Sequence, residues 1–384
     1  MLEVTALPLA ELRERTSEKW REYPADVLPL FVAETDFPLA PAISGALRRA
    51  VETGDTGYIA SRTPLASTYA DFARRRFGWS PDPARMRTTA DVSMGIVEIL
   101  RRVTQPGERV VVTPPVYPPF YDLVAEAGAE VQRVPLRDTG TGWELDLDGI
   151  RAAFDDGATA ILLCNPHNPT GTVHGRDSLA ALAEIADEFG AAVISDEIHA
   201  PLAQPGTGFV PFLHTGEAAE RVGYAVVSAS KAFNLAGLKC AVMVTASDAT
   251  SAVVRGLPIE VEWRTGQFGL LAAIAAFSDE SDPWLDGLLR TLDHNRLLLE
   301  DLVASKLPGA RYRIPDAGYL AWIDLSALGW GDNPARRILK EAKVALHFGP
   351  AFGDEGRGFV RLNFGTSPEI ITEAIERIAS LVGR

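Results

Sequence analysis

The sequence contains little cysteine: Cys164 and Cys240 are the two cysteines among 384 residues. Two are too few for a disulfide-stapled fold, and both lie in apolar, strand-like runs, so we expect reduced packing residues. A long apolar run is also missing from residues 1–20, where charged side chains are interspersed with apolar ones. We therefore expect neither a signal peptide nor a membrane-spanning helix there, and a cytoplasmic location.

The chain has fewer basic than acidic side chains. The chain has 37 Lys and Arg residues against 51 Asp and Glu residues, a formal net charge of −14. Proteins that bind nucleic acids in general, or anionic membranes, need a basic surface to neutralise phosphates. The charge therefore argues against both kinds of partner and favours a small-molecule substrate.

The residues that are present favour a large folded core. Hydrophobic residues make up 47% of the chain and aromatic residues 8%, and its length suggests two or more domains. Between about residues 84 and 246, short β-branched runs alternate with helical patterns, which indicates an α/β fold with a mainly parallel sheet. The expected strands include 109–113, 158–164, 191–195 and 224–228, and Gly190 ends an expected helix at 178–189.

The pattern changes after a leucine-rich stretch. Residues 282–306 predict one long helix. Strand-like runs follow at 311–314, 319–324, 344–348 and 358–363, and residues 368–382 predict a final amphipathic helix. This part of the chain predicts a second, smaller α+β domain.

A lysine follows one predicted strand, in the segment Ser-Ala-Ser-Lys-Ala-Phe-Asn-Leu-Ala-Gly-Leu-Lys at 228–239. Lys231 is flanked by Ser228 and Ser230, and Lys239 adds a second cation. A lysine that forms a Schiff base must be desolvated enough to be nucleophilic, and hydroxyls with a second cation suit a phosphate dianion. Taken alone, the segment is equally compatible with a surface lysine in a loop.

Carboxylates stand at the end of another predicted strand. Asp196 and Glu197 follow the run 191–195, and His199 comes two residues later. Open α/β sheets bind ligands at the carboxyl ends of their strands, where a carboxylate can pair with a protonated pyridine nitrogen. The alternatives are a helix-capping or ion-paired aspartate and a metal site. No further histidine and carboxylate cluster at a ligand spacing supports a metal.

Three further segments suit the same pocket. The loop Cys-Asn-Pro-His-Asn-Pro-Thr-Gly at 164–171 is rigid and polar; Asn168 could donate to a phenolate oxygen, although these are also ordinary turn residues. Residues 93–100 resemble a helix start, whose free amides would hold a phosphate, but taken alone they favour an ordinary helix. Tyr117, in a proline-rich loop, either stacks on an aromatic ring or simply packs.

Three motifs resemble those of the fold-type I pyridoxal 5′-phosphate (PLP) enzymes: Asn-Pro-His-Asn-Pro at 165–169, Asp-Glu-Ile-His at 196–199, and the lysine segment at 228–237. The resemblance is to the class I/II aminotransferase family, and within it to the cystathionine β-lyase or cysteine C–S lyase branch, which residues 19–20 and 28–37 also resemble. It implies a large domain with a mainly parallel, seven-stranded sheet flanked by helices, and a smaller α+β domain. The implied division is 1–40, an N-terminal part of the small domain; 41–282, the PLP-binding domain; and 283–384, the linking helix and the rest of the small domain.

The resemblance also implies roles for residues that would hold PLP. Lys231 would be the Schiff-base lysine, Asp196 the partner of the pyridinium nitrogen, Asn168 the donor to the ring oxygen and Tyr117 the stacking ring. The remaining implied cofactor-binding residues are His199, Ser228, Ser230, Lys239 and the amides of Gly95, Ile96 and Val97, with Tyr58 reaching the phosphate from a neighbouring subunit. A homodimer with shared active sites follows from the role of Tyr58.

On the substrate side, the resemblance makes Arg361 the residue that grips the α-carboxylate; the alternative for Arg361 is a surface ion pair. Asn168, Tyr117, Glu34 and Thr35 would also border the substrate. The sequence departs from the branch at three places: Glu34-Thr35 replaces Asp-Met, Pro118 replaces a second tyrosine, and Lys239 replaces an arginine found in many aminotransferases. The preference for the side chain of the substrate and the geometry of phosphate binding are therefore left open.

An enzyme of this branch would remove the α-proton of an L-cysteine S-conjugate with Lys231 and eliminate the thiolate, releasing thiol, pyruvate and ammonia. Transamination between an L-amino acid and a keto acid is the alternative, because no residue identified in the sequence enforces elimination. A regulatory protein with a PLP-enzyme fold is a third possibility, and the presence of Lys231, Asp196, Asn168 and Arg361 argues against it.

Overall fold

The computed structural model describes residues 2–60 and 63–383. Its largest sheet has seven strands: β2 (Met86–Thr89), β3 (Arg109–Val112), β4 (Glu130–Arg133), β7 (Ala158–Cys164), β8 (Ala192–Asp196), β9 (Gly223–Val227) and β10 (Ala241–Val244). They lie in the order β2-β10-β9-β8-β7-β3-β4. Strand β10 runs antiparallel to both of its neighbours, β2 and β9, and the other four pairs of neighbouring strands are parallel. The predicted mainly parallel, seven-stranded sheet is therefore confirmed.

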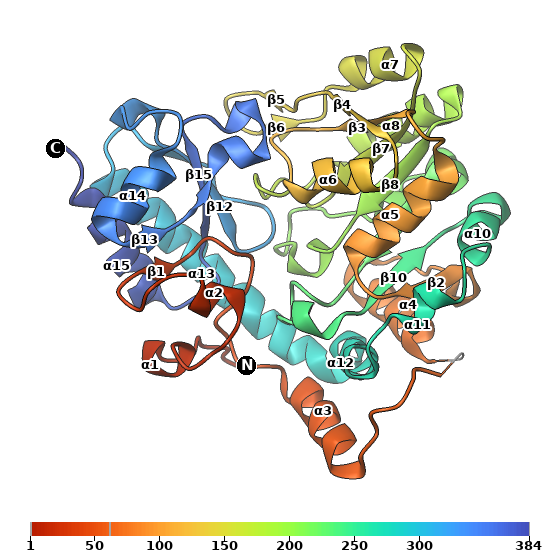
Figure 1. Cartoon of the computed structure of the whole chain (residues 1–384), viewed down its shortest axis with the longest axis horizontal. Helices are drawn as coiled ribbons and strands as arrows, with labels where there is room; N and C mark the ends of the chain where they lie inside the picture. The colour runs from red at the N-terminus through yellow and green to blue at the C-terminus, as the bar shows by residue number, and fades with distance from the viewer. Residues whose placement is uncertain (1, 61–62, 384) are drawn as a thin grey trace.

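Helices cover both faces of this sheet (Figure 1). Successive residues of a strand point to opposite faces, so Val193 joins one core and Ile194 the other. The Ile194 side holds α5 (Val92–Val103), α6 (Pro119–Glu126), α10 (Asp248–Arg255) and α11 (Glu260–Trp263). The Val193 side holds α4 (Leu65–Phe77), α7 (Leu147–Asp155), α8 (Arg176–Phe189), α9 (Glu217–Val222) and α12 (Gln267–Phe277). Burial on both faces explains why the inner strands β7, β9 and β10 are almost entirely apolar, whereas the edge strands β2 and β4 carry polar residues.

One complete helix-to-strand step shows how the sequence specifies these elements. Helix α8 buries Leu179, Leu182 and Ile185, which recur at helical spacing. Gly190 then adopts a φ of 65°, a left-handed conformation that ends the helix before β8 begins. The expected helix at 178–189 is confirmed and starts two residues earlier, at Arg176.

The C-terminal part forms a smaller antiparallel sheet. Its strands are β11 (Arg311–Tyr312), β12 (Leu320–Asp324), β14 (His347–Phe348) and β15 (Phe359–Asn363), in the order β11-β12-β15-β14. The helices are α13 (Asp282–Lys306), α14 (Pro334–Ala342) and α15 (Pro368–Ala379). Helix α13 runs from beside α12 to this sheet, as Figure 1 shows, and it matches the predicted 282–306 helix.

The predicted single strand at 344–348 is wrong, because the chain changes sheets there. Residues 344–345 form β13 (Val344–Ala345), which pairs in parallel with β1 (Leu28–Pro29), whereas β14 pairs with β15. Val344 and Ala345 are both buried, which strict alternation on one half-exposed sheet would not allow. The β1-β13 pair places the N-terminal elements beside the C-terminal sheet (Figure 1).

The remaining elements are α1 (Leu9–Leu12), α2 (Glu18–Arg21), α3 (Pro41–Thr53), β5 (Arg137–Asp138) and β6 (Trp143–Glu144). The division of the chain at residues 40 and 282 stays a prediction. Within the described residues, every helix is too short or too polar to traverse a lipid bilayer.

Candidate active site

A cavity of about 360 Å³ opens at the carboxyl ends of β7 and β8, where α/β sheets bind their ligands. Eight of the predicted site residues line it: Tyr117, Asn168, Asp196, His199, Ser230, Lys231, Lys239 and Arg361. They come from both sheets, since Arg361 lies on β15 and the other seven lie on the large sheet and its loops. Folding thus gathers residues that are far apart in the sequence around one cavity.

Lys231 lies in the loop that follows β9. Its Nζ donates a hydrogen bond to the Ala33 carbonyl oxygen at 3.3 Å. Desolvation, together with the positive charge of Arg361, lowers the pKa of Lys231 to about 8, against the attraction of Asp196 and Glu34. A substantial share of the amine is therefore neutral and nucleophilic close to neutral pH.

Asp196 ends strand β8, beside Cys164 at the end of β7. The backbone N–H of Ile198 donates to its Oδ1 at 3.0 Å. Burial raises the pKa of Asp196 to about 6, although that hydrogen bond and the charge of Lys231 act in the opposite direction. At neutral pH the carboxylate is ionised and can pair with a cationic ring nitrogen.

Glu197 and His199 diverge from Asp196. Glu197 Oε1 accepts hydrogen bonds from the Phe212 N–H at 2.7 Å and from Ser195 Oγ at 3.1 Å, outside the cavity. His199 lines the cavity, and burial lowers its pKa to about 3, so the imidazole is neutral. Residues 2–60 and 63–383 contain no cluster of three His, Cys, Asp or Glu side chains arranged to hold a metal.

Arg361 is a buried cation, with 3% of its surface exposed. Its Nη1 donates to Asn168 Oδ1 at 3.1 Å and its Nη2 to the Phe31 carbonyl oxygen at 2.8 Å. Desolvation lowers the pKa of Arg361 to about 10, although Tyr117 and Tyr319 act in the opposite direction, and no carboxylate among the described residues forms an ion pair with it. Its Nε has no hydrogen-bond partner there either. A buried guanidinium without a carboxylate partner suits an incoming anion.

Tyr117 stands on the cavity wall near Asn168 and Asp196. Its ring meets Phe120 edge to face, with centroids 5.9 Å apart. Burial raises the pKa of Tyr117, and the negative charge of Asp196 adds to this, so the phenol stays neutral. A neutral aromatic ring in this position is suited to stacking on a flat ligand.

Hydrogen-bond donors collect at the end of the cavity formed by α5. Asp91 caps this helix, since its Oδ1 accepts from the Met94 N–H at 2.8 Å, and its Oδ2 accepts from Lys239 Nζ at 3.0 Å. The next residues, Val92 and Ser93, line the cavity together with Ser230 and Lys239. First-turn amides have no acceptor within their helix, so this end of the cavity suits a phosphate.

The structure does not bring the predicted phosphate-binding amides of Gly95, Ile96 and Val97 to the cavity. Helix α5 begins at Val92, and the Gly95 N–H already donates to the Asp91 carbonyl oxygen at 3.0 Å. The amides of the next two residues are likewise inside the helix, and none of the three residues lines the cavity. Gly95 serves packing, because a Cβ atom there would lie 2.9 Å from Val226 Cγ1. The capping residue Asp91 was the sequence signal for the true helix start.

Three other predicted site residues also lie off the cavity wall, and their roles stay predictions. Ser228 does not line the cavity; its Oγ donates to the Cys240 carbonyl oxygen at 2.7 Å and lies 2.7 Å from Ser230 Oγ, so it supports Ser230 from behind. Glu34 and Thr35 do not line the cavity either, and residues 31–33 do so instead. The negative charge of Glu34 acts at longer range, where it partly offsets the lowering of the Lys231 pKa.

Tyr58 is 94% exposed in the single chain, away from the cavity. Its implied role in a neighbouring subunit stays a prediction.

His347 is a cavity residue that the sequence did not reveal. It lies on β14 directly opposite Arg361 on β15, and its ring meets Phe352 with centroids 4.8 Å apart. Burial lowers its pKa to about 4, and the charge of Arg361 adds to this. The pairing of the two strands brings His347 to the cavity, and sequence spacing does not disclose which strands pair.

Comparison with known proteins identifies the family. Residues 34–378 match the family model for aminotransferase class I and II. The chain belongs to this family. It is 45% identical to the "Putative cystathionine beta-lyase" of Mycobacterium tuberculosis, over 97% of this chain and 96% of that protein. It is 36% identical to the "Cystathionine beta-lyase" of Corynebacterium glutamicum, over 97% and 99% of the two chains.

Solved structures agree with this membership of the class I and II aminotransferase family. The structure described as a "putative plp-dependent beta-cystathionase" from Corynebacterium diphtheriae has a TM-score of 0.94 and 34% identity, with 99% of both chains covered. The family and the fold implied by the sequence motifs are therefore confirmed.

Proposed function

We propose that this protein is a PLP-dependent lyase that breaks the Cβ–S bond of L-cysteine S-conjugates and releases a thiol, pyruvate and ammonia. The observation that carries the proposal is the buried guanidinium of Arg361, which faces the same cavity as the Lys231 amine. An α-amino acid can enter with its carboxylate on Arg361 and its amino group toward Lys231. The relatives named cystathionine beta-lyase support the lyase reaction.

The side chains around the cavity suit PLP by their chemistry. Lys231 supplies the amine that holds the cofactor, and Asp196 supplies a buried carboxylate for its ring nitrogen. Lys239, Ser230 and the first turn of α5 offer a cation, a hydroxyl and backbone N–H groups for its phosphate. When bound, PLP supplies an electron sink for the electrons of the Cα–H bond that breaks.

The chain's own residues then have defined tasks. Arg361 holds the substrate carboxylate and so orients the Cα–H bond. Lys231, whose pKa is lowered to about 8, accepts the α-proton at Nζ once its amine is free. Asp196 remains ionised and stabilises positive charge at the cofactor nitrogen. Departure of the thiolate from Cβ, followed by hydrolysis, accounts for the three products.

A pyruvate assay tests the reaction. The protein is incubated with L-cystathionine, L-cysteine and bulkier cysteine S-conjugates, without any added keto acid. Many turnovers per site support elimination. Absence of pyruvate, with about one equivalent per site of the keto acid derived from the conjugate and more of it once an acceptor keto acid is added, supports transamination. This second candidate is kept open by the 28% identical aspartate/prephenate aminotransferase of Thermus thermophilus. A purely regulatory protein would show no turnover of these amino acids, with or without an added keto acid.

A homodimer with shared sites belongs to the same proposal. The Tyr58 side chain is 94% exposed, and its hydroxyl would contact the phosphate in the partner's site. Mixing Lys231→Ala with Tyr58→Ala protomers tests this. If the sites are shared, each mixed dimer has one site with both defects and one intact site, so activity returns above that of either variant alone. No recovery after verified subunit exchange contradicts the sharing.

A further inference from the structure

Residues 31–36, here called the strap, cross the cavity between the Lys231 loop and strand β15. The carbonyl oxygen of Ala33 accepts hydrogen bonds from Lys231 Nζ at 3.3 Å and from Tyr319 Oη at 3.0 Å. The carbonyl oxygen of Phe31 accepts one from Arg361 Nη2 at 2.8 Å. The backbone of the strap therefore sets where the amine and the guanidinium of the proposed reaction lie.

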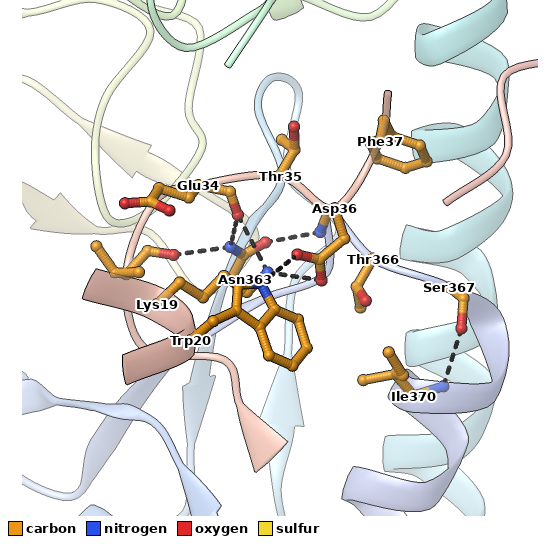
Figure 2. Close-up of polar contacts among 12 residues, drawn as sticks. Lys19, Trp20, Glu34, Thr35, Asp36, Phe37, Asn363, Thr366, Ser367 and Ile370 are labelled. Carbon is orange, nitrogen blue, oxygen red and sulfur yellow. Dashed lines mark hydrogen bonds and ion pairs between the residues drawn. The ribbon is translucent and has the colours of Figure 1, made fainter. Parts of the chain in front are cut away.

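The strap ends in Asp36, which is tied to the short helix α2. Asp36 Oδ2 accepts from Lys19 Nζ at 2.8 Å, and Oδ1 accepts from Trp20 Nε1 at 3.1 Å. Lys19 Nζ also donates to the Glu34 carbonyl oxygen at 3.2 Å. Figure 2 shows Lys19 and Trp20 reaching from the helix to the carboxylate side by side. The side chains of Lys19 and Asp36 are 0% exposed, so solvent and salt screen this pair little.

Asn363 holds the strap from the opposite side. Its Nδ2 donates to the carbonyl oxygen of Val32 at 2.7 Å. It also donates to the carbonyl oxygen of Glu34 at 2.6 Å, a contact that Figure 2 shows. Asn363 lies two residues beyond Arg361 on β15, so the same strand carries the guanidinium and a clamp for the strap.

Asn234 connects the strap to the loop that carries Lys231. It lies three residues after Lys231, and its side chain bonds both the N–H and the carbonyl oxygen of Thr35, each at 3.1 Å. The strap is thus fastened to the loop of Lys231, to the strand of Arg361 and to helix α2.

Stability alone is a weak explanation for the buried pair. Removing two charges from water costs free energy that their attraction often fails to recover, and apolar pairs commonly replace such bridges without loss of stability. Helix α2 has only four residues, far below the length at which a helix holds by itself. The pair does fix the orientation of the strap, because both Asp36 carboxylate oxygens and the Glu34 carbonyl oxygen accept hydrogen bonds from defined donors.

We propose that the Lys19–Asp36 pair, completed by Trp20, is a positioning unit: it holds the strap over the cavity so that Phe31 and Ala33 orient Arg361 for the substrate carboxylate and Lys231 for its amine. The expected change in KM rests on the proposed function. The expected change in hydrogen exchange of the strap rests only on the contacts described above. None of the three residues touches the substrate in this role.

The test uses Lys19→Met, which keeps the chain length and removes the charge. The KM for the conjugate that the wild type turns over is expected to rise about tenfold, because a displaced guanidinium weakens carboxylate binding, and kcat is expected to fall by a smaller factor, because a displaced Lys231 amine slows proton removal. Hydrogen–deuterium exchange is expected to become faster at the amides of Thr35 and Asp36, while peptides from β7 and β8 keep their protection. The exchange measurement needs no turnover, so failure of the proposed reaction does not affect it.

Arg75→Met is the matched control, since Arg75 also bonds one carboxylate and one backbone carbonyl, Asp282 at 2.8 Å and Phe277 at 2.9 Å, at a distance in the fold from the cavity. It should leave KM and strap exchange unchanged. If Lys19→Met does not fold, Trp20→Phe removes only the indole donor and should raise KM and strap exchange in the same direction. Unchanged strap exchange, or faster exchange with an unchanged KM, overturns the proposal.

Discussion

Arg361 and Asn168 meet at 3.1 Å, with the guanidinium Nη1 donating to the amide oxygen Oδ1. The contact joins strand β15 to the loop after β7, and it leaves the Asn168 amide nitrogen free to donate to a ligand. The residue expected to grip the substrate therefore also orients the residue expected to contact the cofactor ring. In the proposed function, this hydrogen bond would couple substrate binding to the orientation of the cofactor ring.

Replacing Arg361 with lysine should raise the KM for an L-cysteine S-conjugate by about 10- to 100-fold, because a point charge cannot reproduce bidentate carboxylate binding. Cofactor content, measured from the absorbance of bound PLP, should stay close to that of the wild type. The control is Arg357→Lys, an exposed arginine paired with Asp332 and Asp354. An unchanged KM in Arg361→Lys would show that the carboxylate binds elsewhere.

Asp196→Asn should lower kcat by about 100-fold or more, since a preorganised charge at the reacting system is lost. The variant keeps the shape of the side chain and its hydrogen bond from Ile198, so the protein should fold and melt near the wild-type temperature. Asp187→Asn, on the surface of α8, provides the control for carboxylate loss alone. Wild-type turnover at saturating substrate would contradict the assigned role.

Capture of PLP by the cofactor-free protein should depend on pH through Lys231. Its pKa is lowered to about 8, so the neutral amine predominates above that pH and decreases about tenfold for each unit below it. The capture rate should therefore rise with pH and level off above about 8, measured by the change in cofactor absorbance. Borohydride should fix one PLP per wild-type chain and none in Lys231→Ala. A pH-independent rate, or labelling of the variant, contradicts the prediction.

Glu197→Gln should change how stability depends on pH. Burial raises the pKa of Glu197 from 4.5 to about 8, so the folded state binds a proton that the unfolded state loses between those values. Its contribution to stability is complete below pH 4.5 and disappears as the pH rises to about 8. The Tm of the variant relative to the wild type should therefore increase by a few degrees from pH 5 to pH 8. Glu188→Gln, a substitution at an exposed position of α8, should show no such trend. If the Tm of Glu197→Gln and of the wild type change in parallel with pH, the raised pKa of Glu197 is refuted.

Local patterns predicted most of the elements and the central residues. Strand-end motifs located Lys231, Asp196 and Asn168, because the carboxyl ends of parallel strands meet at one edge whatever the details of packing. The resemblance added Arg361 and Tyr117, which also line the cavity. The sequence did not show that Gly95, Ile96 and Val97 lie inside α5 and off the cavity wall, since the capping role of Asp91 depends on where the backbone turns into the helix.

The sequence by itself determined the fold class and the family and pointed to Lys231 as the candidate anchoring lysine, because apolar periodicity and short motifs are properties of neighbouring residues. Only the tertiary structure decided what lies opposite those residues. It split 344–348 between two sheets, brought His347 beside Arg361, and set the strap over Lys231 through the buried Lys19–Asp36 pair. Such contacts join segments separated by up to hundreds of residues, and they arise from strand pairing and burial that no local pattern encodes.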